Sequence, residues 1–509
     1  MSSCHPVAVA PEHSPPSDTP GARAHLPRPG LGGLIVGAAL VATLVVISRR
    51  VGDPDFWWHM ETGSWIINHG AFPSRELFTY TASTRVWADQ EWGSEVLGYL
   101  IFRAGGFLAF SLAYAAVTWV GFWFIWRRIA LERVPALIAG ACIAVAAAAG
   151  VEVWGPRSQM ISFALTCLTL YWVESYLRDR NRRLYLLPLV VLAWANLHGG
   201  FVYGLAVVAL AAVTETALWL TSSQDGAHRR RSLRLWGVLI ACVVAGLLNP
   251  ITFHAYQAAV QTQTSAVQQT FIAEWHSPSF HSLGEVGLEL LLLLVVFAMA
   301  FRRPRLWDAL VTVVGIYAAL SAVRNAPLAA AALTPMVAWS LGGAWERSRW
   351  PEPLGRWIQR RASDLLVLVT AGTLLVAVGT AGVMTYTLSS QTASTNANFP
   401  VGADDWLAAH PEVGTRMFNA YDWGGYLIYR YYPDRPVFIY GEATELGNQL
   451  LQEVSDVENA EPNWQTILTE HGVNYVVERT DSALSMALSV DPQWKQVYSD
   501  GFALIFVKR

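Results

Sequence analysis

Long apolar runs, separated by short polar segments, occupy most of the chain between residues 31 and 387. A helix that crosses a membrane needs about 20 mostly apolar residues, so the pattern predicts a bundle of about eleven transmembrane helices. These helices are expected near residues 31–48, 106–126, 134–150, 159–177, 184–197, 200–221, 235–249, 284–301, 306–322, 326–343 and 365–387. Residues 94–105 are amphipathic, which favours a helix that lies in the membrane interface.

The two ends of the chain differ from this apolar middle. Residues 1–30 are rich in Pro, Ser, Ala and Gly, which predicts a disordered cytoplasmic tail. From residue 388 the charge is ordinary and helical and extended patterns alternate, so 388–509 should form a small α/β domain. The predicted fold class is an α-helical polytopic membrane protein over 31–387 with a small C-terminal α/β domain. In that domain we expect helices over 404–410 and 423–431, extended segments over 416–419, 437–440 and 473–477, and a terminal hairpin over 494–507.

The overall composition supports a membrane protein and excludes several soluble classes. The chain is 53% hydrophobic and 14% charged, whereas soluble domains carry roughly 25% charged residues. Its four cysteines have the spacing of neither a disulfide framework nor a zinc site. The sequence has no Walker loop and no Gly-rich dinucleotide motif after a predicted strand. We therefore expect no nucleotide or nucleic-acid partner.

Arginine is distributed unevenly among the predicted loops. When the N-terminal tail is placed in the cytoplasm, nearly all arginine clusters fall on the cytoplasmic side, as the positive-inside rule expects. The clusters lie within residues 127–133, 178–183, 229–234, 302–305 and 347–361, and the pair Arg49-Arg50 is the exception. The first outer loop, residues 49–105, and the C-terminal domain are then extracytoplasmic.

The same topology sends the polar motifs to one face of the membrane. Ionisable groups at membrane helix ends are costly to place and are expected to be functional. We therefore expect one polar chamber at the outer face, roofed by Trp-rich loops. The residues expected there are Asp53, Asp55, His59, Glu91, Arg157, Gln159, His198, Asn249, Glu274, His276, His281 and Arg324.

The acidic start of the first outer loop, Asp53-Pro54-Asp55, has two interpretations. As a helix start, Asp53 would be the N-cap, Pro54 the first helical residue and Asp55 part of the first turn. As a functional site, these carboxylates could take a proton from an acceptor hydroxyl or help to hold a divalent metal. His59 lies four residues after Asp55 and could share its helix face. Glu91 would be the second acid of the site if the loop folds back over Asp53.

Two single arginines and one histidine extend the candidate site. Arg157, which Gln159 follows closely, begins a span, and Arg324 lies between two spans. Each guanidinium could extend to the membrane interface or grip a phosphate, and two in one chamber would match a phosphate or pyrophosphate group. His198, before two glycines, is either a capping residue or a donor to the reacting group.

Aromatic residues near these motifs also allow two interpretations. Trp57 and Trp58 fit an aromatic belt at the membrane interface or a stacking surface for a sugar. In the C-terminal domain, the turn-like junctions 422–426 and 440–442 fit either packing or the binding of an acceptor.

A series of motifs, taken in chain order, resembles one family. They are Asp53-Pro54-Asp55-Phe56-Trp57-Trp58-His59, Glu91-Trp92, Arg157-Ser158-Gln159, residues 194–200, Leu248-Asn249-Pro250, residues 274–278 and Trp423-Gly424-Gly425-Tyr426. Together they resemble a large group of bacterial membrane proteins of the GT-C glycosyltransferase type, over most of the chain from residue 50 onward. Such sequences often have His before the Glu of the second motif, where this chain has Gln90.

This resemblance implies a polyprenyl-phosphate-linked sugar donor, used on the outer side of a bacterial plasma (inner) membrane, with a lipid, glycan or protein acceptor. It also implies a catalytic aspartate in the first loop, sometimes with a divalent metal such as Mg²⁺ or Mn²⁺ and with no other cofactor. Asp53 matches that aspartate best and Asp55 second. The candidate metal ligands are Asp53, Asp55 and His59.

The resulting hypothesis is a membrane glycosyltransferase with Asp53 as the general base and with Asp55 and Glu91 as further catalytic residues. The residues expected to bind the donor and its phosphate are Arg157, Gln159, His198 and Arg324. The alternative is a non-catalytic membrane protein that binds a lipid or glycan or assists assembly. A transporter is less favoured, because its ionisable residues should lie near the bilayer midplane.

Overall fold

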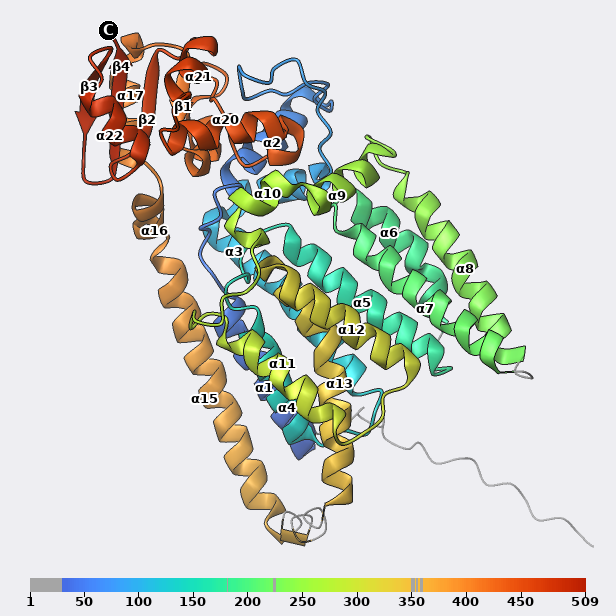
Figure 1. The fold of residues 1–509 in the computed structure, drawn as a ribbon. Coiled ribbons are helices and arrows are strands. Elements are labelled where there is room, and N and C mark those ends of the chain that lie inside the picture. The colour runs from blue at the N-terminus through green and yellow to red at the C-terminus, as the bar shows by residue number, and fades with distance from the viewer. Residues whose placement is uncertain (1–29, 181, 223–225, 349–352, 354–355, 358–359) are drawn as a thin grey trace, which may run out of the picture.

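The structure is a computed structural model that describes residues 30–180, 182–222, 226–348, 353, 356–357 and 360–509. A bundle of long helices carries a small domain with a β-sheet at one end (Figure 1). The fold class predicted from the sequence is confirmed. The predicted disordered tail lies outside the described residues, except for Gly30.

Every apolar segment predicted from the sequence contains a helix. Among the described residues, five helices are long and apolar enough to cross a membrane, and five shorter apolar helices accompany them. The exact number of spans stays a prediction. The bundle helices are α1 (Leu31–Ile47), α3 (Trp92–Ile129), α4 (Ala136–Ala149), α5 (Gln159–Leu177), α6 (Leu187–Ala195), α7 (Phe201–Thr221), α8 (Gly226–Gly246), α11 (Val286–Met299), α12 (Leu306–Ser321), α13 (Ala326–Arg347) and α15 (Ala362–Ser389).

The amphipathic segment and the span after it form one kinked helix, α3. Its backbone leaves the helical conformation at Gly105 and Gly106, and Gly106 has φ +61°, a left-handed conformation that favours glycine. Before this break, Leu97 and Leu100 are exposed, as an amphipathic helix requires. The placement of this half in a membrane interface stays a prediction.

The first and last long apolar helices lie side by side. α1 packs against both α4 and α15, while α3 packs against α5 and α7 against α8. Because α15 returns to α1, the C-terminal domain that follows it lies at the same end of the bundle as the loop after α1 (Figure 1). Sequence segments from the two ends of the chain therefore meet there.

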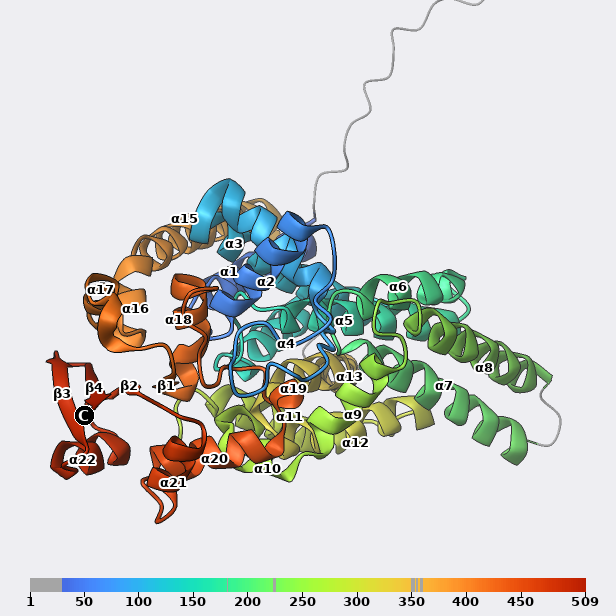
Figure 2. The same ribbon diagram turned by 90° about the horizontal axis from the view of Figure 1, so that it is seen from above.

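The loop after α1 is built around a helix that packs against the C-terminal domain. This helix, α2 (Phe56–His69), contacts α18 (Gly424–Tyr431), and Figure 2 shows the two close together. Trp57 and Trp58 are buried, and their rings contact Tyr426 and Tyr440 with centroid distances of 5.2 and 5.3 Å. These two tryptophans are packing residues of the domain contact, so both predicted roles for them are wrong.

A second segment of the bundle also reaches the C-terminal domain. It consists of α9 (His254–Thr264), α10 (Ala266–Phe271) and a 3-10 turn at Ala273–Trp275. In the C-terminal domain, α19 (Ala443–Leu446) contacts α9, and α20 (Asn448–Glu458) contacts α10. The space between bundle and domain is therefore bounded on two sides.

The C-terminal domain contains one four-stranded sheet in the order β1-β2-β4-β3. β1 pairs with β2 in parallel, and the other neighbours are antiparallel. The predicted terminal hairpin is confirmed as β3 and β4. The elements are α16 (Gln391–Asn398), α17 (Val401–Ala409), β1 (Met417–Asn419), α21 (Trp464–Glu470), β2 (Tyr475–Arg479), α22 (Ala483–Val490), β3 (Trp494–Ser499) and β4 (Ala503–Lys508).

The extended segment predicted at residues 437–440 is not a strand of this sheet. Its backbone pairs instead with the first loop, where the Val437 N–H donates to the Phe78 carbonyl at 2.9 Å and Val437 forms an isolated bridge with Thr79. Residues 437–440 are fully buried. The extended segment therefore exists, but its partner comes from the other end of the chain.

Candidate active site

A cavity of about 470 Å³ lies between the helix bundle and the C-terminal domain. Its lining comes from the loop after α1, from α3, from the start of α5, from the turns before α7 and α13, from the α9–α10 segment and from the α18–α19 region. The structure brings together in this lining all of the candidate site residues predicted from the sequence: Asp53, Asp55, His59, Glu91, Arg157, Gln159, His198 and Arg324. Glu274 also lines the cavity, whereas Asn249, His276 and His281 do not, so their predicted place in the chamber is wrong.

The Asp53-Pro54-Asp55 turn is held by its own hydrogen bond and by an arginine. The Asp55 N–H donates to Asp53 Oδ1 at 3.0 Å, and Asp53 Oδ2 lies 3.1 Å from Arg157 Nε. α2 begins at Phe56, and neither aspartate side chain caps its backbone N–H groups. The Asp53 side chain nevertheless accepts from the N–H two residues later, as the predicted helix-start role requires, and its other carboxylate oxygen faces Arg157.

Asp55 lies directly against the C-terminal domain. Its Oδ1 accepts a hydrogen bond from Trp58 Nε1 at 3.0 Å. Burial, together with the charge of Asp53, raises the pKa of Asp55 to about 6. A Cβ atom at Gly441 would lie only 1.6 Å from Asp55 Oδ1, so a side chain at position 441 would displace this carboxylate.

The loop that carries Asp53 is also fixed by the segment after α15. The side-chain amide of Gln391 accepts from the Val51 N–H at 2.9 Å and donates to the Val51 carbonyl at 2.8 Å. Both residues are buried. Gln391 therefore satisfies both backbone groups of a residue two positions before Asp53 and ties this loop to the C-terminal part of the chain.

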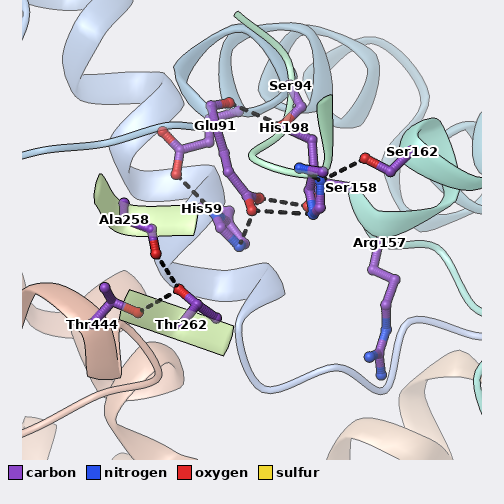
Figure 3. A network of polar contacts seen from close by, with 12 residues as sticks. His59, Glu91, Ser94, Arg157, Ser158, Ser162, His198, Ala258, Thr262 and Thr444 are labelled. Atoms are coloured by element: carbon purple, nitrogen blue, oxygen red, sulfur yellow. Dashed lines mark hydrogen bonds and ion pairs between the residues drawn. The ribbon is translucent and has the colours of Figure 1, made fainter. Parts of the chain in front are cut away.

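Glu91 is the centre of a polar network (Figure 3). Its Oε2 accepts a hydrogen bond from Ser158 Oγ at 2.5 Å, and its Oε1 lies 3.4 Å from His198 Nε2. His59 Nε2 lies 3.9 Å from Glu91 Oε2. Two histidines and a serine from three different segments therefore surround one carboxylate at the cavity wall.

The hydrogen bonds around His198 assign its tautomer. The Gly200 N–H donates to His198 Nδ1 at 2.8 Å, so that nitrogen is an acceptor. Ser162 Oγ is 2.7 Å from the same atom and itself accepts from Trp194 Nε1 at 2.7 Å. Burial lowers the pKa of His198, which favours a neutral ring with its proton on Nε2. That N–H faces Glu91 and the cavity.

His59 is oriented by a buried glutamate that the sequence prediction missed. Glu95 is 1% exposed, and its Oε1 lies 2.7 Å from His59 Nδ1. Its position on α3, four residues after Glu91, was the available signal, because residues four apart share a helix face.

Gln90 packs so closely on the turn after His198 that a Cβ atom at Gly199 would lie 2.2 Å from its Oε1.

The candidate metal ligands do not form a metal site. Asp53 is paired with Arg157, Asp55 accepts from Trp58, and His59 contacts Glu95 through Nδ1. In the part of the chain that the structure describes, no group of three His, Cys, Asp or Glu side chains is arranged to hold a metal ion. The set Asp53, Asp55 and His59 therefore does not fit the predicted metal.

The two predicted phosphate-binding arginines have different surroundings. Arg157 lies between two acids, with Nε 3.1 Å from Asp53 and NH1 2.6 Å from Glu274. The Arg324 guanidinium stacks over the ring of Trp275, 4.4 Å from its centroid, and none of the described carboxylates forms a salt bridge with it. Arg324 is thus the cavity guanidinium that stays available to an anion.

Gln159 supports this arginine through the backbone. Its Nε2 donates to the Arg324 carbonyl at 2.9 Å, while its Oε1 is buried without a hydrogen-bond partner. Gln159 therefore fixes the turn before α13 with one N–H of its amide, and its role in donor binding stays a prediction.

The C-terminal domain supplies further cavity residues; Tyr421 and Thr444 were not predicted, whereas Glu442 belongs to the junction 440–442, for which acceptor binding was one of two interpretations. Tyr421, Glu442 and Thr444 line the cavity, and Thr444 Oγ1 lies 3.1 Å from Thr262 Oγ1 of α9 (Figure 3). Burial, with the nearby charges of Glu91 and Asp55, raises the pKa of Glu442 to about 8. The junction 440–442 was recognised as a turn, but its sequence gave no sign that it faces the first loop.

Comparison with solved structures shows the GT-C fold predicted from the motifs. The oligosaccharyltransferase of Archaeoglobus fulgidus in its apo form has 12% sequence identity and a TM-score of 0.56 over 89% of this chain and 70% of its own. The oligosaccharyltransferase AglB from the same organism, in complex with an inhibitory peptide and a dolichol-phosphate, has 11% identity and a TM-score of 0.55 over 93% and 74%.

ArnT from Cupriavidus metallidurans, bound to undecaprenyl phosphate, matches with 15% identity and a TM-score of 0.48 over 93% of this chain and 97% of its own. No family model and no curated protein matches this chain. The fold assignment rests on the two oligosaccharyltransferase structures, and at these identities the likeness is one of fold.

Proposed function

We propose that this protein is a membrane glycosyltransferase that moves a sugar from a polyprenyl-phosphate-linked donor to an acceptor hydroxyl. The proposal rests on one cavity that is lined by Asp53, Asp55, Glu91 and Arg324. Asp53 is paired with Arg157, whereas Arg324 stacks on Trp275 and forms no salt bridge with a described carboxylate. The structural neighbour that contains a dolichol-phosphate supports a lipid phosphate as the donor group.

Asp53 is the proposed general base. Asp53 must lie within hydrogen-bond reach of the acceptor hydroxyl whose proton it takes, and Asp53 lines the cavity with its Oδ2 oriented by Arg157. Asp55 is its neighbour and positions the turn through its contact with Trp58. Arg157 thus has a positioning role in this proposal, which differs from the phosphate-binding role predicted from the sequence.

The leaving phosphate is proposed to bind Arg324. A guanidinium presents several donors in a fixed fork that suits phosphate, and Arg324 is held by stacking on Trp275 rather than by an acid. The Nε2–H of His198 supplies a second donor near Glu91. Stabilisation of the developing negative charge by such preorganised donors is usually the largest catalytic term.

The variant Asp53→Asn tests this function. General-base catalysis contributes about 10²- to 10⁴-fold, so we expect transfer from a polyprenyl-phosphate sugar to fall by that factor while the protein still folds. The exposed Asp434→Asn, outside the cavity lining, is the matched control. Wild-type turnover by Asp53→Asn would remove the assignment. A wild-type protein that retains polyprenyl phosphate but never transfers sugar would favour the non-catalytic binding protein.

We also propose that the cavity opens on the extracytoplasmic side of a bacterial plasma membrane. The arginine clusters lie in loops at the other ends of the same helices, and such clusters mark the cytoplasmic face. A membrane-impermeant thiol reagent should label a cysteine introduced at the exposed Glu470 of the C-terminal domain in intact cells. Labelling only after the cells are opened would reverse this orientation.

A further inference from the structure

A second cavity, of about 330 Å³, lies beside the first, between the end of α10 and the C-terminal domain. The two cavities share four lining residues, Phe271, Ile272, Tyr421 and Asp422, which therefore form a partition between them. The remaining lining of the second cavity is Ala420, Leu451, Val454, Ser455, Glu458, Asn459, Glu478, Arg479 and Ser482.

The partition is fixed from both sides. The Tyr421 N–H donates to Glu458 Oε1 at 2.8 Å, on the side of the second cavity, while its hydroxyl donates to the Gly441 carbonyl at 3.3 Å, on the side of the first. Asp422 Oδ2 lies 3.1 Å from Arg479 NH2. One tyrosine thus spans the boundary, and a molecule in the second cavity would lie next to the proposed reaction site.

The second cavity contains a buried polar atom without a partner. Glu478 is 1% exposed, and its Oε1 accepts from the Arg479 N–H at 2.8 Å. Its Oε2 is buried and forms no hydrogen bond with the described part of the chain. An unsatisfied buried carboxyl oxygen costs free energy, and a hydroxyl of a bound ligand would satisfy it.

The charges of this cavity disfavour an anion. Its arginine, Arg479, is paired with Asp422, which leaves Glu458 and Glu478 and no unpaired cation among the lining residues. Phosphate would therefore be placed against carboxyl groups here, whereas the first cavity offers Arg324. The first cavity therefore suits an anionic ligand, and the second suits an uncharged one.

The uncharged ligand that fits best is a sugar. Ser455, Asn459 and Ser482 add hydroxyl and amide groups that both donate and accept hydrogen bonds. Phe271, Leu451 and Val454 add apolar and aromatic surface suited to the C–H faces of a pyranose or furanose ring. A few placed polar groups on an apolar wall are typical of small-molecule sites.

We propose that the second cavity binds a neutral, hydroxyl-rich sugar unit of the acceptor, which is thereby held across the Tyr421 partition from the lipid-linked donor. This inference rests on the proposed function in one respect, the identification of the bound sugar as part of the acceptor. The binding of a neutral sugar at Glu478 and Ser455 does not depend on it.

The test is a binding titration of the full-length protein in detergent with methyl glycosides of glucose, galactose, mannose and arabinose. We expect at least one to bind the wild type. Ser455→Phe, which fills the cavity, and Glu478→Leu, which removes the unpartnered oxygen, should each raise its dissociation constant about tenfold or more. Gln452→Ala, on an exposed position of α20, is the control and should bind like the wild type.

The same samples are titrated with undecaprenyl phosphate, which should bind all variants equally because it occupies the first cavity. Melting curves show whether Ser455→Phe folds. If it does not fold, the test depends on Glu478→Leu, which replaces the carboxyl by an apolar group of similar size. Three results would overturn the proposal. No glycoside binds, both variants bind the glycoside like the wild type, or the cavity binds a Ser- and Thr-rich peptide and no glycoside. Glycoside binding that the variants abolish, without binding of undecaprenyl phosphate, would support the sugar site and contradict the proposed donor.

Discussion

Both ends of the helix bundle bury charged residues, but they do so in different ways. At the end away from the C-terminal domain, Arg128 is 2% exposed and its NH2 lies 2.5 Å from Glu174 Oε1. Arg128 also donates to the Ala331 carbonyl, and Trp307 Nε1 donates to the same glutamate at 3.2 Å. The cavity in this cluster has a volume of about 20 Å³.

At the other end, similar residues surround about 470 Å³ of space. Arg324 has no acid partner in the described chain, and burial raises the pKa values of Glu442 and Asp55, which line the same cavity. The comparison teaches that a buried arginine and glutamate are not enough to mark a site. The distinguishing feature is whether the protein itself occupies the space that the charges face, because only unfilled space admits a ligand.

The largest expected effect breaks the closed cluster. Arg128→Met leaves the buried Glu174 without its main partner, and loss of one partner of a buried pair costs about 3–5 kcal/mol. We expect a strong fall in thermal stability in detergent, with little change in the affinity of the folded fraction for undecaprenyl phosphate. The double variant Arg128→Met/Glu174→Gln should recover much of the stability. If Arg128→Met weakened donor binding without destabilising the protein, the two ends would not differ as described.

The intermediate effect concerns the arginine of the open cavity. Arg324→Gln removes a charge-assisted contact worth about 1.5–3 kcal/mol, which corresponds to about 10- to 150-fold weaker binding of undecaprenyl phosphate. Its melting temperature should stay close to that of the wild type, because no acid is left unpaired. The exposed Arg103→Gln is the control. A destabilised Arg324→Gln with unchanged phosphate affinity would make this arginine structural, like Arg128.

The third expected effect is a dependence of stability on pH. The pKa of Glu442 is about 8 in the folded protein against 4.5 ordinarily, so the folded state binds a proton that the unfolded state releases between these values. Stability from this group is therefore present at low pH and is lost as the pH rises from about 4.5 to 8.

We expect the apparent melting temperature of Glu442→Gln to fall less over this range than that of the wild type, by about 2–4 °C for each kcal/mol of stability that the wild type loses through this titration. The exposed Glu470→Gln should follow the wild type. A wild-type stability that rises between pH 5 and 8, or an equal slope in Glu442→Gln, would contradict the raised pKa.

Much of the fold was predictable because its signals are local. Each apolar run contains the helix expected of it, and the terminal hairpin lies where the alternating pattern and the Asp500-Gly501 turn placed it. One cavity lining contains Asp53, Glu91, Arg157 and Arg324. This grouping was predicted from the side of the membrane on which their loops should lie, without knowledge of their contacts.

The parts that failed depend on contacts between distant segments. Residues 437–440 have the composition of a strand, but their partner is the backbone at Phe78. The sequence predicts only a turn at Gly441, whereas in the structure the carboxylate of Asp55 occupies the position that a Cβ atom at residue 441 would take. The pairing of Arg157 with both Asp53 and Glu274 likewise joins distant segments, and no local pattern reveals which arginine lacks an acid.

The bidentate contact between Gln391 and Val51 has a consequence for biosynthesis. A ribosome that has made the first spans has produced Asp53, but the amide that anchors its loop and the glycine that accommodates Asp55 are still hundreds of codons away. The cavity is therefore completed only when translation is nearly finished, and a truncated product would lack the part of its lining that the C-terminal domain supplies.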